Sequence, residues 1–125
     1  MDRWLVVMAG GALGSLARYL FVRALAERFP AQFPTGTFVV NITGSFLIGL
    51  LMSIISARPE LHPNWRLFLV VGGLGGYTTF SSFEWETFSL VQGGHAVMGL
   101  GYVLSSITAG YAAVWLGAIL SRLLP

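Results

Sequence analysis

The chain is poor in charged residues and contains no cysteine. Only 10% of its 125 residues are charged, 55% are hydrophobic, and the mean hydropathy is +0.75, whereas soluble domains carry roughly 25% charged residues. This composition excludes an ordinary soluble domain and predicts an integral membrane protein. Without cysteine there is no disulfide, no thiolate metal site and no cysteine nucleophile.

Lysine and the common catalytic motifs are absent as well. The basic residues are all arginines spread along the chain, so the net charge of +2 indicates neither nucleic-acid binding nor a polybasic lipid anchor. The sequence contains no HExxH, GxSxG or Walker-type phosphate loop, and we expect no enzyme. His62 and His95 stand alone in expected turns and are interpreted as solvated.

Two acidic residues follow each other closely in the third apolar run. Glu84 and Glu86 point to different faces of a helix, which makes them a poor acid–base pair. Glu86 could tune the mouth of a pore, but the simpler interpretation of both is a solvated residue at the membrane interface.

The apolar runs are long enough for about four membrane spans, since a spanning helix needs roughly 20 apolar residues. We expect one membrane domain over residues 1–125, with spans at about 4–26, 35–57, 65–92 and 95–123. Prolines between the first three spans and the Gly93-Gly94 pair before the fourth predict the turns. We expect no cleaved signal peptide, because the first apolar run is too long and contains Arg18 and Arg23. The expected fold class is all-α integral membrane.

The third span contains a segment that does not suit a continuous helix in lipid. Residues 72–83 read GGLGGYTTFSSF. Unpaired backbone groups find no water in a bilayer, and interrupted membrane helices commonly border ion or substrate sites. The segment predicts a break near residues 75–79. Carbonyls freed near Gly75 to Thr78 would suit a hard cation, and N–H groups of the half-helix that starts near Thr79 would suit an anion.

Polar side chains inside the spans are candidate site residues. Asn41 shares a helix face with Thr37 and Ser45, and its amide could donate to an anion, although an interhelical hydrogen bond is the simpler interpretation of a buried amide. Tyr102 and Ser106 lie one turn apart on the fourth span and form a track of hydroxyls.

Two phenylalanines follow the break at helical spacing. Phe80 and Phe83 alternate with the hydroxyls of Thr79, Ser81 and Ser82, which favours the border of a polar path over ordinary core packing. Because an aromatic ring has a positive edge, two such edges could hold a small anion without a full positive charge.

The arginines barely favour one orientation in the membrane. Four are expected at one end and three toward the other, namely Arg3, Arg58, Arg66 and Arg122 against Arg18, Arg23 and Arg28. Either a weak bias is corrected by an insertion partner, or the protein inserts in both orientations and pairs antiparallel.

Small residues recur at helical spacing on three spans. They are Gly10 with Gly14, Ser45 with Gly49, and Gly101, Ser105, Ala109, Ala113 and Gly117. Such stripes let helices approach closely in lipid. Packing within one chain explains the first stripe well and the last less well, so we expect a homo-oligomer.

Three segments resemble, in order and spacing, the Fluc (CrcB) fluoride channel family. They are GGALGSLARY at 10–19, GTFVVNITGSF at 36–46 and GGYTTFSSF at 75–83, and the resemblance covers essentially the whole chain. It implies a subunit of four transmembrane helices with a broken third helix, assembled as an antiparallel, dual-topology homodimer with two pores. It further implies passive, selective export of cytoplasmic fluoride across the bacterial inner membrane. Dual topology would account for the near-equal arginine counts.

By position, the resemblance assigns roles to individual residues. Asn41, Phe80 and Phe83 would contact fluoride. The backbone carbonyls of Gly75 and Thr78 would hold a structural sodium ion on the dimer axis.

Further positions complete the expected pathway. Tyr102 and Ser106 match a polar track on the last helix, in which Gly110 replaces a hydroxyl of some members, and Arg18 matches a first-helix arginine with a structural role. The expected fluoride pore consists of Thr37, Asn41, Thr79, Phe80, Ser82, Phe83, Tyr102 and Ser106. Neutral donors suit a channel, because a full charge would release fluoride too slowly.

Two other classes of protein remain open. A proton-coupled multidrug exporter of four helices would need a carboxylate embedded in the membrane, but the first span has none, and Glu84 and Glu86 fall in the wrong helix for this class. An assembly subunit would need the small-residue stripes but no polar track. Flux into liposomes separates a channel, an exchanger and a subunit that transports nothing.

Overall fold

The computed structural model describes residues 2–29 and 32–124, and these residues form helices, turns and a short extended segment without any strand. In chain order the elements are α1 (Arg3–Ala26), α2 (Thr35–Ala57), the π-helix η1 (Arg66–Leu74), the single turn α3 (Gly75–Tyr77), α4 (Phe80–Gln92) and α5 (Ala96–Ser121). Helices α1, α2 and α5 are each long and apolar enough to cross a membrane. The prediction of an all-α membrane protein is confirmed.

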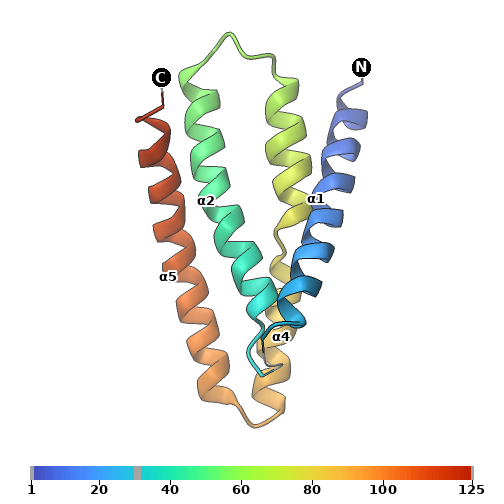
Figure 1. The fold of residues 1–125 in the computed structure, drawn as a ribbon, viewed down its shortest axis with the longest axis vertical. Coiled ribbons are helices and arrows are strands. Elements are labelled where there is room, and N and C mark those ends of the chain that lie inside the picture. The colour runs from blue at the N-terminus through green and yellow to red at the C-terminus, as the bar shows by residue number, and fades with distance from the viewer. Residues whose placement is uncertain (1, 30–31, 125) are drawn as a thin grey trace.

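The helices run up and down beside one another (Figure 1). Both termini and the loop between α2 and η1 lie at one end of the molecule, and the turns that follow α1 and α4 lie at the other. η1, α3 and α4 follow one another along one line, so residues 66–92 together run from end to end. Gly94, with φ of +82°, makes the turn before α5, a conformation that glycine adopts without a steric penalty.

Helix α1 packs on η1 and α3 with backbone against backbone. A Cβ on Gly10 would collide with Phe68 O, and one on Gly14 would collide with Gly73 O. A Cβ on Gly76 would lie 2.6 Å from Gly11 O. Glycines on both partners are therefore needed for this close approach, which is how helices associate where lipid removes the hydrophobic drive. The stripe of Gly10 and Gly14 is therefore used for packing within one chain, as the sequence led us to expect.

Helices α2 and α5 form the second close pair and pack along most of their length. A Cβ on Gly49 would collide with Val114 O, and one on Gly117 would collide with Phe46 O. At the other end of the α5 stripe, no atom lies within 4 Å of the Cβ position of Gly101. The stripe on α5 is thus only partly used inside the chain.

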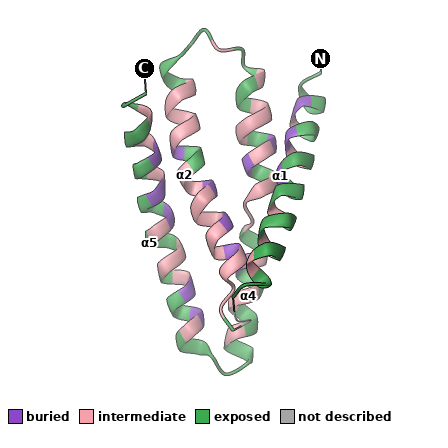
Figure 2. Ribbon diagram, in the orientation of Figure 1, coloured by how far each residue is buried: buried purple, intermediate pink, exposed green. Residues whose placement is uncertain are grey.

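Few side chains are fully covered. Burial concentrates where α2, α4 and α5 meet, and the largest side chains there with almost no exposure are Val40 and Tyr102. The outer sides of α1 and α5 are mostly exposed (Figure 2), and many of their exposed side chains are large and apolar. Such a surface suits contact with lipid or with another subunit.

Candidate functional site

The chain leaves its helical path between α3 and α4. Thr78 (φ −83°, ψ 158°) and Thr79 (φ −149°, ψ 118°) are both extended. The Thr78 N–H still donates to Leu74 O at 2.9 Å, and this is the last helical hydrogen bond before the gap. Thr79 then caps α4, because its Oγ1 accepts the Ser82 N–H at 3.3 Å.

Asn41 on α2 bridges this gap with both ends of its amide. Its Nδ2 donates to Thr79 O at 3.0 Å, and its Oδ1 accepts the Thr79 N–H at 2.9 Å. The side chain thereby supplies an acceptor for the Thr79 N–H, which has lost its helical one, and a donor for the Thr79 carbonyl. This matters because unpaired backbone groups are costly in lipid. An amide carries two N–H groups, and this pairing uses one of them.

The gap changes the surroundings of two backbone carbonyls. In a continuous helix the Thr79 N–H would donate to Gly75 O and the Ser82 N–H to Thr78 O. The first donates to Asn41 instead and the second to Thr79 Oγ1. Gly75 and Thr78 also line a groove of about 470 Å³ between α2 and η1, together with Asn41 and Phe80. Carbonyl oxygens released in this way fit a hard cation, which prefers oxygen ligands.

The two phenylalanine rings lie side by side but differ in burial. Their centroids are 5.8 Å apart at an interplanar angle of 46°. Phe83 is only 7% exposed, and its ring meets the ring of Tyr102 edge to face at 5.0 Å and 67°. Phe80 is 74% exposed and lines the groove beside Gly75.

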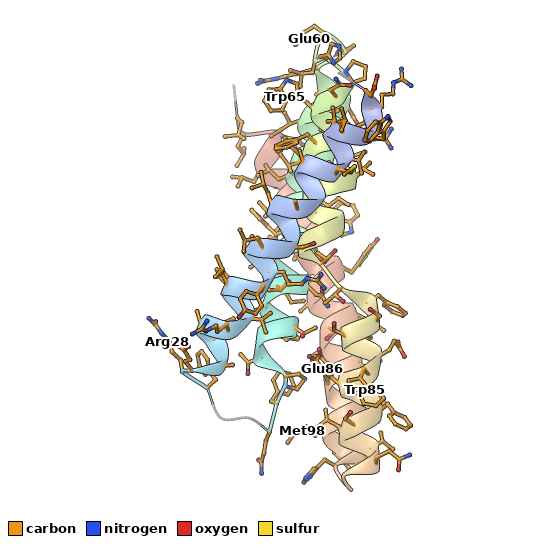
Figure 3. The ribbon with its side chains drawn as sticks, turned by 90° about the vertical axis from the view of Figure 1, so that its right-hand side faces the viewer. Arg28, Glu60, Trp65, Trp85, Glu86 and Met98 are labelled. Carbon is orange, nitrogen blue, oxygen red and sulfur yellow. The ribbon has the colours of Figure 1, made fainter. Side chains whose placement is uncertain are left out.

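Glu86 holds together two of the predicted pore hydroxyls. Thr37 Oγ1 donates to Glu86 Oε1 at 2.6 Å, and Tyr102 Oη donates to Glu86 Oε2 at 2.8 Å. Figure 3 shows Glu86 and Trp85 leaving α4 in different directions, Glu86 toward the other helices and Trp85 outward. The interpretation of Glu86 as a solvated interface residue is therefore wrong, because both of its carboxylate oxygens accept hydrogen bonds from neighbouring helices.

A cavity of about 520 Å³ opens beside Glu86 toward α1. Helix α1 contributes Ser15, Arg18, Tyr19, Val22 and Arg23 to its lining, and Thr37, Thr79, Ser82 and Glu86 complete it. Thr79 and Ser82 are also linked by a hydrogen bond of 3.0 Å between their hydroxyls. Cationic and neutral donors thus line this cavity together with the carboxylate of Glu86, and the donors among them are groups that can bind a small anion.

Ser106 stands apart from this network. Its Oγ is buried and has no hydrogen-bond partner among the described residues. The other predicted pore residues form two groups of hydrogen bonds and ring contacts. Asn41, Thr79 and Ser82 make one, and Thr37, Tyr102, Phe83 and Phe80 make the other, in which Glu86 joins Thr37 to Tyr102. A buried hydroxyl without a partner retains its capacity to donate.

Glu86 is the site residue that sequence reasoning misjudged. It lies one turn after Ser82 and Phe83, so it shares their face of α4. That spacing was visible in the sequence. The different faces of Glu84 and Glu86 exclude an acid–base pair, but they do not exclude that Glu86 points toward the polar track.

Comparisons with known proteins agree with these features. The family described as CrcB-like protein, Camphor Resistance (CrcB), matches residues 5–118. A relative from Solibacter usitatus is 57% identical over 120 residues, covering 96% of this chain and 98% of its own. A relative from Acidobacterium capsulatum is 46% identical, and the match covers 96% of each of the two chains. A relative from Rhizobium meliloti is 44% identical, and the match covers 98% of each chain. Each of the three is named Fluoride-specific ion channel FluC.

These relatives are ion channels by name and not enzymes, as the sequence led us to expect. Their bacterial sources and the three long apolar helices identify a multi-pass bacterial membrane protein. Because the family match and the relatives cover nearly the whole chain, the resemblance noted in the sequence is confirmed, and the chain belongs to the CrcB family.

Proposed function

We propose that this protein is a fluoride channel that lets fluoride leave the cytoplasm passively and selectively through the bacterial inner membrane. One observation carries the proposal: chains named fluoride-specific ion channels match this one over nearly its whole length, at up to 57% identity. The site supports it with chemistry, because hydroxyls, an amide and ring edges converge on an interrupted helix.

The donors suit fluoride better than a larger halide. Fluoride is small and strongly hydrated, so a pore must replace its water with several short hydrogen bonds. The path we propose begins at the cavity lined by Arg18, passes the hydroxyls of Thr79 and Ser82 and the free N–H of Asn41, and continues along the rings of Phe80 and Phe83. Tyr102 and the unpartnered Ser106 hydroxyl extend it along α5.

The hydroxyls beside Glu86 add a condition to this path. Thr37 and Tyr102 each have a single hydroxyl hydrogen, and both hydrogens go to the carboxylate. For either hydroxyl to bind fluoride, the carboxylate must release it. We infer that Glu86 competes with fluoride for these donors, and that its side chain moves as the ion passes.

The pathway is completed, in this proposal, by a second copy in the opposite orientation. Phe80 is 74% exposed and lines an open groove, whereas a binding site normally buries most of its ligand. A four-helix subunit with a broken third helix, paired antiparallel, would cover this side and give two pores per homodimer. The carbonyls of Gly75 and Thr78 would then hold a sodium ion at the dimer axis, where it would supply fixed positive charge and join the subunits.

A second candidate function has one observation in its favour. Glu86 is the partly buried carboxylate that a proton-coupled exporter needs. Such an exporter would move its substrate only with a proton gradient, whereas a channel conducts without one.

Liposomes loaded with potassium fluoride test both candidates. Purified protein should release fluoride through passive flux, measured with a fluoride electrode after a potassium ionophore is added, with no pH gradient imposed. Empty liposomes and chloride-loaded liposomes are the controls. Release that requires a pH gradient would favour the exporter, and no release in either condition would contradict both.

A further inference from the structure

A second tie between α2 and the break lies on the upstream side of the gap. Tyr77 Oη and Thr43 Oγ1 are 2.9 Å apart. Thr43 has one hydroxyl hydrogen, and its Oγ1 lies 2.8 Å from Val39 O and 3.1 Å from Val40 O, which can only accept. The Thr43 hydrogen therefore goes to its own helix, and the phenol of Tyr77 donates to Thr43 Oγ1.

Helix α2 thus contacts three consecutive residues of the interrupted segment. Asn41 pairs with the backbone of Thr79, and Thr43 accepts from Tyr77. Between them, the methyl group of Thr78 occupies the space over Gly44 where a Cβ would collide with it. The gap is held from both sides.

Tyr77 is the last residue of α3, directly before the extended Thr78. α3 continues η1 without interruption, since Leu74 and Gly75 are both helical, and α1 packs against this helix end through Gly14 and Gly76. The side that faces α2 is held by side chains. Asn41 acts only downstream of the gap. The phenol of Tyr77 is the side-chain hydrogen bond from α3 itself to α2, and it fixes the helix end that carries the carbonyl of Gly75.

We propose that Tyr77 is a positioning residue whose hydrogen bond to Thr43 holds α3 against α2 and keeps the gap at Thr78–Thr79 in the geometry that the ion path uses. Its effect on transport rests on the proposed channel function. The hydrogen bond and its effect on the local backbone do not, which allows the two ideas to be tested apart.

The transport test compares Tyr77→Phe and Thr43→Val with two matched controls. Thr43→Ser keeps the accepting hydroxyl, and Tyr111→Phe removes the same phenol oxygen from a ring on α5 that is 66% exposed. The ratio of fluoride to chloride efflux from liposomes should fall roughly three- to tenfold in Tyr77→Phe and Thr43→Val, the range that the net value of one hydrogen bond corresponds to. It should stay near the wild-type ratio in both controls.

The double variant Tyr77→Phe with Thr43→Val makes the test specific. If the two residues act through one hydrogen bond, the double variant should lose no more selectivity than either single variant. A merely structural contact would lower thermal stability and leave the ratio of fluoride to chloride unchanged. Unchanged ratios in both single variants, or additive losses in the double variant, would overturn the proposal.

Hydrogen exchange supplies a readout that does not depend on transport. In lipid nanodiscs, the backbone amides of residues 75–80 should exchange faster in Tyr77→Phe than in the wild type or in Tyr111→Phe, because α3 has lost its tie to α2. If the wild type released no fluoride, the proposed function would fail, but hydrogen exchange would still show whether the hydrogen bond between Tyr77 and Thr43 holds the local backbone. Unchanged exchange at residues 75–80 in both Tyr77→Phe and Thr43→Val would overturn it.

Discussion

The two phenylalanines at the start of α4 face different surroundings. Phe83 is 7% exposed and packs on Tyr102, which donates a hydrogen bond to Glu86, so its whole environment comes from one chain. Phe80 is 74% exposed and borders a groove that also contains Gly75 and Thr78. The surroundings of Phe83 are complete within one chain, whereas the ring of Phe80 and the groove beside it are open to the surroundings of the chain.

This difference indicates which parts of the site depend on assembly. Substitutions on the Phe83 side should affect both the stability of the subunit and its activity. Substitutions on the Phe80 side should affect activity alone, unless they disturb the proposed dimer. Asn41 lies between the two sides, because it lines the groove and also holds the peptide of Thr79.

The largest effect is expected at Asn41, which both sides need. Asn41→Ala leaves the Thr79 N–H without a partner, at a cost of about 1–3 kcal/mol, and removes one donor from the Thr79 carbonyl. Fluoride efflux should fall more than tenfold, and the thermal midpoint should fall as well. Asn41→Asp keeps the acceptor for the Thr79 N–H but turns a carboxylate oxygen toward the Thr79 carbonyl, so this variant should also lose stability and efflux. Normal efflux from well-folded Asn41→Ala would remove Asn41 from the pathway.

Replacing each phenylalanine with isoleucine tests whether Phe80 and Phe83 differ in their contributions to stability and to efflux. Phe83→Ile should lower the thermal midpoint, by an amount corresponding to less than about 1.5 kcal/mol for a swap of similar volume, whereas Phe80→Ile should leave it unchanged. Efflux normalised to dimer content should fall at least tenfold in one of the two, about 1.4 kcal/mol in barrier height. Near-normal efflux in both would contradict the proposed role of the ring edges.

A smaller effect is expected on the Phe83 side from Glu86→Gln. Hydrogen bonds to a charged group are worth about 1 kcal/mol more than those to a neutral one, so Thr37 and Tyr102 should become easier for fluoride to recruit. The fluoride concentration for half-maximal efflux should fall by about fivefold, the factor that this energy represents. Weaker fluoride binding in a folded variant would argue against competition between Glu86 and the ion.

The smallest effect concerns how the Phe80 side is covered. Two or three lysines added to the end that carries both termini should bias insertion and lower efflux partially, because fewer antiparallel pairs would form. Since the chain has no cysteine, a single cysteine added near the N-terminus can be labelled from each side of the membrane. Wild-type labelling from one side only would exclude dual topology.

Much of the fold followed from hydropathy and small residues. The long apolar runs predicted the all-α membrane protein, because a bilayer requires every backbone group of a span to be paired within the chain. The motif at 72–83 predicted where the helix could not continue. Residues Thr78 and Thr79 lie within that segment and are extended.

The site was harder to read, because its residues meet across helices. Nothing along the chain relates Glu86 to Thr37 and Tyr102, which lie on α2 and α5. The partners of Asn41 were equally hidden, since an amide in a span predicts a hydrogen bond but not its acceptor. The exposures of Phe80 and Phe83 could not be distinguished from their spacing alone.

The sequence by itself determined that the protein is an all-helical membrane protein, because that depends on composition and on the length of its apolar runs. Only the tertiary structure decided that Asn41 closes the gap, that Glu86 gathers two hydroxyls, and that Tyr77 meets Thr43. Those contacts depend on how closely the helices approach and on their register. In this chain, glycine contacts between whole helices set both.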